Sequence, residues 1–303
     1  MNNKKNYILI LVCALFNSLN AQTGAKLTNY VYTKEFYNPS YTASNGGSNA
    51  FLLVRQQWLG FEGAPGNQMF SINTSVPHLK SGVGLSFLND VLGGESSQNI
   101  QANYSYTVKA FAGETFIHFG LSTGLSINSL RASEFVYEQQ DPNGLYENAT
   151  KVKPAGKMGI NFSSKNITTG ASVEKAFGTI ENHAFKAPFY YHVELEYWRD
   201  LTKDIEMLAS AYFHKTNYVA ATELNLFGIY QNKFWAGAAY RYKISLNSLF
   251  GVVINNKFKI GYSFDLPMGQ LQTYLSGSHE IFLSIVLKDP SKTHFYYKSP
   301  RFF

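Results

Sequence analysis

The chain has 303 residues, of which 45% are hydrophobic, 16% aromatic and 15% charged, and its formal net charge is +6. This weak positive charge, without clustered Lys or Arg, argues against a nucleic-acid binder. The single cysteine, Cys13, lies in the expected signal sequence, so the mature chain has no residue for a disulfide or a thiolate metal site.

The first 21 residues are typical of a secretory signal peptide. Lys4 and Lys5 supply the charged start, the apolar stretch runs from Tyr7 to Phe16, and Ala21 is a suitable cleavage point. That stretch is too short to cross a bilayer as a helix. Cys13 raises the alternative of a lipoprotein, but only a short apolar run precedes it, so we expect cleavage.

Residues 22–50 are polar and precede the first expected strand. We expect them to form a periplasmic N-terminal leader or a plug that folds into the molecule from the periplasmic side. A disordered leader is the alternative that the sequence leaves open.

From Phe51 to Leu287 the chain repeats about fourteen segments in which apolar and polar residues alternate, as in Phe70-Ser71-Ile72-Asn73-Thr74-Ser75-Val76. A period of two places all apolar side chains on one face of a β-strand. The expected strands are 51–58, 68–76, 81–89, 98–108, 115–127, 157–164, 166–174, 189–199, 204–214, 218–230, 233–242, 245–254, 257–265 and 278–288.

A soluble sandwich and a membrane barrel both show this alternation, and the secretory signal favours the barrel. The 21 Tyr and 24 Phe residues fit aromatic girdles at the two membrane interfaces. Connections after odd strands are mostly long (59–67, 90–97, 128–156, 175–188 and 266–277), and those after even strands are short. We therefore predict an all-β fold, a transmembrane antiparallel β-barrel of about 14 strands over residues 51–288. Residues 289–303 would form a periplasmic C-terminal tail.

Charged residues within the expected strands fall on the face that would line the lumen. They are Arg55, Glu194, Glu196, Glu206, Glu223, Arg241, Lys259 and Glu280. Unpaired charges in a confined space are costly, so we expect a lumen network of ion pairs within a generally polar lumen. Glu194 and Glu196 could instead act as an acid–base pair, but no nucleophile or metal-ligand set accompanies them.

Other signs of catalysis are incomplete. His279-Glu280 begins a zinc-protease motif, but Leu283 stands where its second histidine would be. Gly82-x-Gly84 lacks the third glycine of a dinucleotide site. We therefore expect no enzymatic activity, no cofactor and no metal site.

Several stretches together resemble the PorP/SprF family of type IX secretion and gliding-motility outer-membrane proteins. They are Tyr37-Asn38-Pro39-Ser40-Tyr41-Thr42-Ala43-Ser44, Arg55-Gln56-Gln57-Trp58-Leu59-Gly60-Phe61-Glu62-Gly63-Ala64-Pro65, residues 82–90, residues 277–281 and Ser299-Pro300-Arg301-Phe302-Phe303. Thr42 and Ser44 stand where Ala and Gly are common in the family. The resemblance implies a non-enzymatic barrel that retains a secreted protein at the cell surface through its C-terminal sorting domain, together with other secretion components.

Aromatic residues in the long loops would gather on one rim, because all these loops follow odd strands. The candidate partner-binding rim comprises Trp58, Phe61, Pro65, Phe135, Tyr137, Tyr146, Phe185 and Tyr274. Aromatic residues among polar ones are typical of protein-recognition surfaces. The alternative is that these residues merely pack the loops against one another. The alternative functions are a FadL-like transporter for hydrophobic solutes, which needs an apolar track, and a membrane hydrolase, which needs a Ser/His pair.

Overall fold

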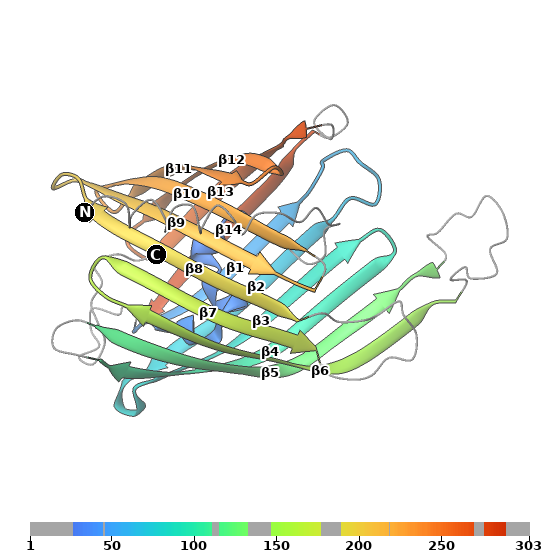
Figure 1. Ribbon diagram of the computed structural model, residues 1–303, viewed down its shortest axis with the longest axis horizontal. Helices are drawn as coiled ribbons and strands as arrows, with labels where there is room; N and C mark the ends of the chain where they lie inside the picture. The colour runs from blue at the N-terminus through green and yellow to red at the C-terminus, as the bar shows by residue number, and fades with distance from the viewer. Residues whose placement is uncertain are drawn as a thin grey trace, which may run out of the picture.

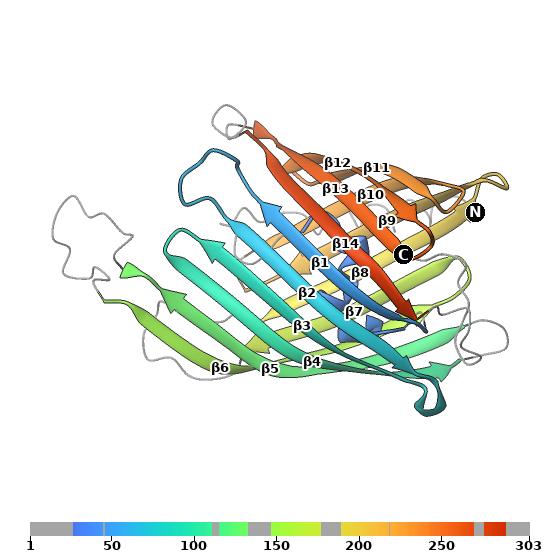
Figure 2. The ribbon, with the colours of Figure 1, turned by 180° about the vertical axis from the view of Figure 1, so that it is seen from behind.

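Fourteen antiparallel strands form a closed barrel, in which β1 pairs with both β2 and β14. The computed structural model describes residues 27–44, 46–110, 115–132, 147–176, 189–217, 219–269 and 276–288. In both views the strands run obliquely around one central space (Figures 1 and 2). The predicted fold class and strand number are confirmed.

The strands occupy nearly all of the sequence between Ser48 and Lys288. They are β1 Ser48–Gln56, β2 Gly66–Val76, β3 Ser81–Leu92, β4 Glu95–Lys109, β5 Phe116–Leu130, β6 Ala149–Ser163, β7 Ile167–Ala176, β8 Tyr190–Asp200, β9 Ile205–Lys215, β10 Ala220–Tyr230, β11 Phe234–Arg241, β12 Ser245–Ile254, β13 Phe258–Pro267 and β14 Ser278–Lys288.

Two expected loops were wrong in length. The expected loop 90–97 is a two-residue turn, because Leu92 pairs with Glu95 and Gly93 adopts a φ of +54°. Left-handed backbone at such positions matches the twist of a two-residue hairpin, which makes glycine suitable there. β6 begins eight residues earlier than expected, and it includes Pro154.

Pro154 is compatible with a strand because the first part of β6 has only one neighbour. β6 pairs with β5 from Ala149 onward, whereas its pairing with β7 begins at Ala155. A proline lacks the N–H that a central ladder position needs, so it fits where one side of the strand is unpaired. Pro154 falls within the loop 128–156 that the sequence pattern predicted, so that expected loop was too long at its C-terminal end.

The connections define two different ends of the barrel. The loop end carries the connections 57–65, 93–94, 131–148, 177–189, 216–219, 242–244 and 268–277. The turn end carries the connections 77–80, 110–115, 164–166, 201–204, 231–233 and 255–257. Four of the five long connections expected after odd strands are therefore present at the loop end.

The alternation of the sequence separates an outer apolar face from an inner face. On β10, Leu224 is 53% exposed, whereas its neighbour Glu223 is 3% exposed. Leu52, Phe70, Leu121 and Phe250 point outward in the same way on other strands. This continuous apolar exterior is the surface that a membrane barrel presents to lipid.

The N-terminal residues 27–44, which we call the plug, lie inside the ring of strands (blue in Figures 1 and 2). The plug contains the short helices η1 Tyr30–Tyr32, α2 Lys34–Tyr37 and η2 Pro39–Tyr41. Thr28 hydrogen-bonds Asp265 near the loop end of β13, at 2.7 Å. Gly46, just beyond the plug, accepts a bond of 2.9 Å from the Ser75 hydroxyl near the turn end of β2. The chain therefore runs through the lumen from the loop end to the turn end before β1 begins.

Candidate functional site: the filled lumen and the loop end

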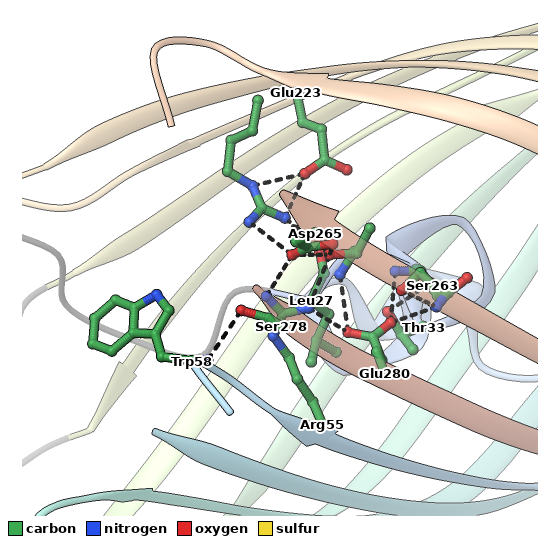
Figure 3. Close-up of polar contacts among 12 residues, drawn as sticks. Leu27, Thr33, Arg55, Trp58, Glu223, Ser263, Asp265, Ser278 and Glu280 are labelled. Carbon is green, nitrogen blue, oxygen red and sulfur yellow. Dashed lines mark hydrogen bonds and ion pairs between the residues drawn. The ribbon is translucent and has the colours of Figure 1, made fainter. Parts of the chain in front are cut away.

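Five charged residues from five strands form a buried group near the loop end, which we call the ion cluster: Arg55, Glu223, Arg241, Asp265 and Glu280. Arg55 lies 2.6 Å from Asp265 and 3.1 Å from Glu280. Arg241 lies 2.6 Å from Glu223 and 3.6 Å from Asp265, so Asp265 joins the two arginines (Figure 3). Each charge has an opposite charge in contact, which offsets the cost of removing it from water.

The start of the plug completes the ion cluster. The backbone N–H groups of Thr28 and Asn29 donate to the two oxygens of Glu280, at 3.0 and 2.8 Å. The Thr28 hydroxyl donates to Asp265 and accepts a bond of 2.9 Å from Arg55. Carboxylate oxygens have several lone pairs, and the plug supplies donors that the two arginines cannot. Figure 3 shows Leu27 and Thr33 beside these carboxylates.

The other charges of the expected lumen network lie elsewhere. Glu196 is 2.8 Å from the Lys34 ammonium of the plug, and Glu194 accepts a bond of 3.0 Å from the Asn38 side chain. Glu206 and Lys259 are half-buried close to the turn end, away from the ion cluster. The sequence reasoning missed Asp265, although it shares the two-residue alternation of Lys259.

Strands β3–β7 form what we call the small-residue wall. Its buried inward residues are mainly Gly, Ser, Asn and Thr: Gly82, Ser86, Asn103, Ser105, Thr107, Ser122, Ser126, Asn161, Gly170 and Ser172. Three of them bind the plug directly. Ser105 donates to the Thr42 carbonyl at 2.7 Å, Asn161 to the Ser40 hydroxyl at 3.0 Å, and Ser172 to the Tyr37 carbonyl at 2.8 Å.

Glycines in this wall allow the plug to approach the strand backbone. A Cβ atom at Gly120 would clash with the backbone of Ser40, and one at Gly159 would clash with the Asn38 side chain. Asn38 caps η2, because its Oδ1 accepts the Ser40 N–H at 3.1 Å. The Asn38–Thr42 stretch and the glycine-containing strands therefore fit each other, since only glycine permits so close a contact.

The opposite side of the lumen, β8–β14 with β1, forms the large-residue wall. Its inward apolar side chains are Trp198, Leu208, Phe227, Ile229, Trp235, Leu249, Phe282, Phe51 and Leu53. Tyr30, Val31 and Phe36 of the plug belong to the same buried cluster, and Tyr30 stacks on Tyr212 with 4.6 Å between ring centroids. The expectation of a generally polar lumen is wrong on this side, because the plug supplies apolar partners for these residues.

A small space remains at the turn end. A cavity of about 160 Å³ is lined by polar residues, among them Lys34, Glu35, Glu196, His118 and Lys165, and by apolar residues such as Val31 and Trp198. Glu35 accepts hydrogen bonds from Ser71 and Asn73. Burial raises the pKa of the Glu35 carboxyl, and these two hydrogen bonds partly oppose the shift.

In the part of the chain that the structure describes, no group of three or more His, Cys, Asp or Glu residues is placed to hold a metal ion. Among the same residues, no helix has the length and apolar character needed to cross a membrane.

Only three of the eight candidate rim residues lie in described parts of the chain. Trp58 is half-buried and meets Phe61 edge to face, with 6.5 Å between centroids, while Phe61 is 58% exposed beside Leu59 at 52%. Pro65 is buried, and its carbonyl accepts the Gln57 N–H at 2.9 Å, which closes the loop. Phe135, Tyr137, Tyr146, Phe185 and Tyr274 fall outside the described residues.

Solved structures with a similar fold include a toluene transporter and a monoaromatic hydrocarbon channel. The Ralstonia pickettii toluene transporter TbuX superposes with a TM-score of 0.51 at 9% identity, covering 82% of this chain and 91% of that one. The CymD monoaromatic hydrocarbon channel gives 0.51 at 11% identity, covering 89% and 93%. At such low identities the likeness concerns the fold alone. A search of curated proteins found no match.

The sequence itself matches one family over most of its length. Residues 19–285 match the family described as type IX secretion system membrane protein PorP/SprF. The matched region includes the plug, all the inward glycines and the five residues of the ion cluster. The chain therefore belongs to the PorP/SprF family of type IX secretion system membrane proteins.

Proposed function

We propose that this barrel is a non-enzymatic anchor that retains a secreted protein at the cell surface by binding its C-terminal sorting domain. The observation that carries the proposal is the filled lumen. Plug residues contact both walls, bind the ion cluster and occupy the apolar side of the interior. A barrel whose interior is occupied by its own chain acts through its ends.

The loop end is the surface we assign to the partner. Leu59 and Phe61 are exposed at the tip of the first loop, and their loop is held by the bond from Leu59 N–H to the Gly277 carbonyl at 3.2 Å. Exposed aromatic and apolar residues on a fixed backbone are suited to protein recognition, because little side-chain freedom is lost on binding. In this proposal the loop end faces outward, residues 1–21 are removed, and the turn end faces the periplasm.

The test removes the longest loop without touching a strand. Residues 134–146 would be replaced by a short Gly/Ser linker, which leaves β6 intact because it begins at Ala149. We expect the heat-modifiable barrel to remain in the outer membrane while a protein with a C-terminal sorting domain appears in the medium. Mass spectrometry of surface and medium fractions measures the redistribution.

A matched change separates binding from loop packing. The pair Leu59→Ser and Phe61→Ser removes exposed apolar surface and leaves Trp58 and Pro65 in place. If both variants keep every sorting-domain protein on the cells, the loop end is not the binding surface.

A FadL-like transporter is the second candidate, and the apolar side of the lumen favours it. Such a function requires the plug to leave that surface. Toluene uptake by a deletion strain and its parent measures this directly. If the deletion strain takes up less toluene than its parent and its surface proteome is unchanged, the protein is a transporter and not an anchor.

A further inference from the structure

The turn end carries one lysine at each connection around the barrel. Lys80, Lys109, Lys165, Lys203, Lys233 and Lys257 lie in or next to the six turns, and β14 ends at Lys288. All seven are exposed. The six turns and the residues directly beside them contain three acidic residues, Glu114, Asp200 and Asp204. The net positive charge is therefore distributed around the whole ring.

The loop end has the opposite balance. Counted in the same way, its connections and the residues directly beside them contain seven acidic residues, Glu62, Glu95, Glu134, Glu138, Asp141, Glu147 and Glu181, and five basic residues, Arg131, Lys186, Lys215, Arg241 and Lys243. The two ends of one barrel therefore offer different surfaces to charged partners. If these charges served only to keep both ends solvated, the two ends would need no difference in charge balance.

Strand alternation directs some of the lysines toward the barrel axis. Lys109 has the inward parity of Ser105 and Thr107 on β4. Lys233 continues the inward positions of β11, since its carbonyl still pairs with the Val253 N–H at 2.7 Å. Lys165 lines the cavity of about 160 Å³. We call Lys109, Lys165 and Lys233 the mouth lysines.

Because the mouth lysines point toward the barrel axis, we expect them to contact a macromolecule at the opening and not the lipid around the outside of the barrel. Lipid headgroups surround the outer edge, and Lys257, 5.8 Å from the Phe258 ring centroid, leans toward that edge. The mouth lysines surround the opening beside the cavity instead. The C-terminal residues 289–303 do not complement them, because they contain one acidic residue, Asp289, and three basic ones, Lys292, Lys298 and Arg301.

We propose that the mouth of the barrel at the turn end is a docking surface for an acidic polypeptide, held by the three mouth lysines. Complementary charge speeds association and fixes orientation, and its effect falls as salt rises. This surface is separate from the loop end that anchors the secreted protein.

The test measures binding of a fluorescein-labelled polyglutamate peptide to the full-length barrel in neutral phosphatidylcholine nanodiscs. The mouth variant combines Lys109→Gln, Lys165→Gln and Lys233→Gln. Its control combines Lys151→Gln, Lys215→Gln and Lys243→Gln, which removes equal charge at the loop end. Heat-modifiable migration checks that every variant is folded.

We expect the mouth variant to bind about tenfold more weakly than the unchanged barrel, while the control stays within about twofold. Absence of binding to the unchanged barrel, or equal loss in both variants, overturns the proposal. A lipid arm uses nanodiscs containing phosphatidylglycerol. If that lipid displaces the peptide and its enrichment around the barrel depends on the mouth lysines, the site binds lipid phosphate and the proposal fails.

Discussion

The two walls of the lumen hold the same plug by different means. The small-residue wall, β3–β7, contacts the backbone of Asn38–Thr42 through glycines and short hydroxyl or amide side chains. The large-residue wall contacts Tyr30, Val31 and Phe36 with aromatic and aliphatic side chains, and its ion cluster binds Thr28 and Asn29. Close backbone contact defines position on one side, whereas burial and charge supply most of the stabilisation on the other.

This difference has a physical origin in the plug. Its first half carries large side chains and the buried backbone N–H groups of Thr28 and Asn29, so it needs apolar partners and carboxylate acceptors. Its second half is a tight capped turn whose backbone lies against the strands. A side chain in place of Gly120 or Gly159 on those strands would push the turn away from them. Each wall therefore matches the segment that it faces, since a buried surface must be both filled and hydrogen-bonded.

The largest expected effect comes from breaking the ion cluster. Arg55→Leu leaves Asp265 and Glu280 buried without their shared cation, and removal of one partner of a buried pair costs about 3–5 kcal/mol. We expect the midpoint of urea unfolding, followed by loss of heat-modifiable migration, to fall strongly. Adding Asp265→Asn should recover part of the loss. No recovery would mean that Arg55 stabilises the barrel by packing and not by charge.

The next effect distinguishes the lumen from the lipid face on β10. Leu224→Arg places a charge on the outer surface, where it costs about 2–4 kcal/mol near the membrane midplane. Glu223→Gln, one residue earlier, faces the ion cluster and keeps a hydrogen-bonding side chain beside Arg241. Arg241 also keeps its opposite charge, because Asp265 lies 3.6 Å away. We expect membrane assembly in liposomes to suffer more from the first change. Equal yields of folded barrel would contradict the assignment of faces.

The smallest effect tests the small-residue wall. Gly159→Val would force the Asn38 side chain away, and overpacking of this kind costs about 1–3 kcal/mol. Gly228→Val is the matched control, because a Cβ atom there meets no atom within 4 Å. Limited proteolysis of the folded barrel should cleave the plug of the first variant and spare the second. Similar cleavage of both would show that Gly159 does not position the plug.

Strand positions could be predicted because alternation is a local property of the sequence. Residues such as Ile72, Leu224 and Ile260 point outward wherever their strand lies in the ring, so the faces follow from parity alone. The expected loops 90–97 and 128–156 were too long. Gly93 lies in a two-residue turn, and Pro154 lies where β6 is paired on one side only.

The partners of the lumen charges could not be predicted in the same way. Parity places Glu194, Glu196, Glu223 and Glu280 on the inner face, but it does not reveal what lies opposite. Glu280 meets Arg55 and the plug backbone, while Glu196 meets Lys34, 162 residues earlier in the chain. Contacts between residues so far apart in the chain leave no periodic signal in the sequence.

The sequence by itself determined the barrel, the approximate strands, the inner and outer faces and the family. These properties depend on the order of apolar and polar residues and on short motifs. Only the tertiary structure decided the path of residues 27–44 through the lumen, the role of Asp265, and the contrast between the two walls. They arise when the ring closes and brings β1, β13 and β14 around a segment from the start of the chain, because contact partners depend on three-dimensional position.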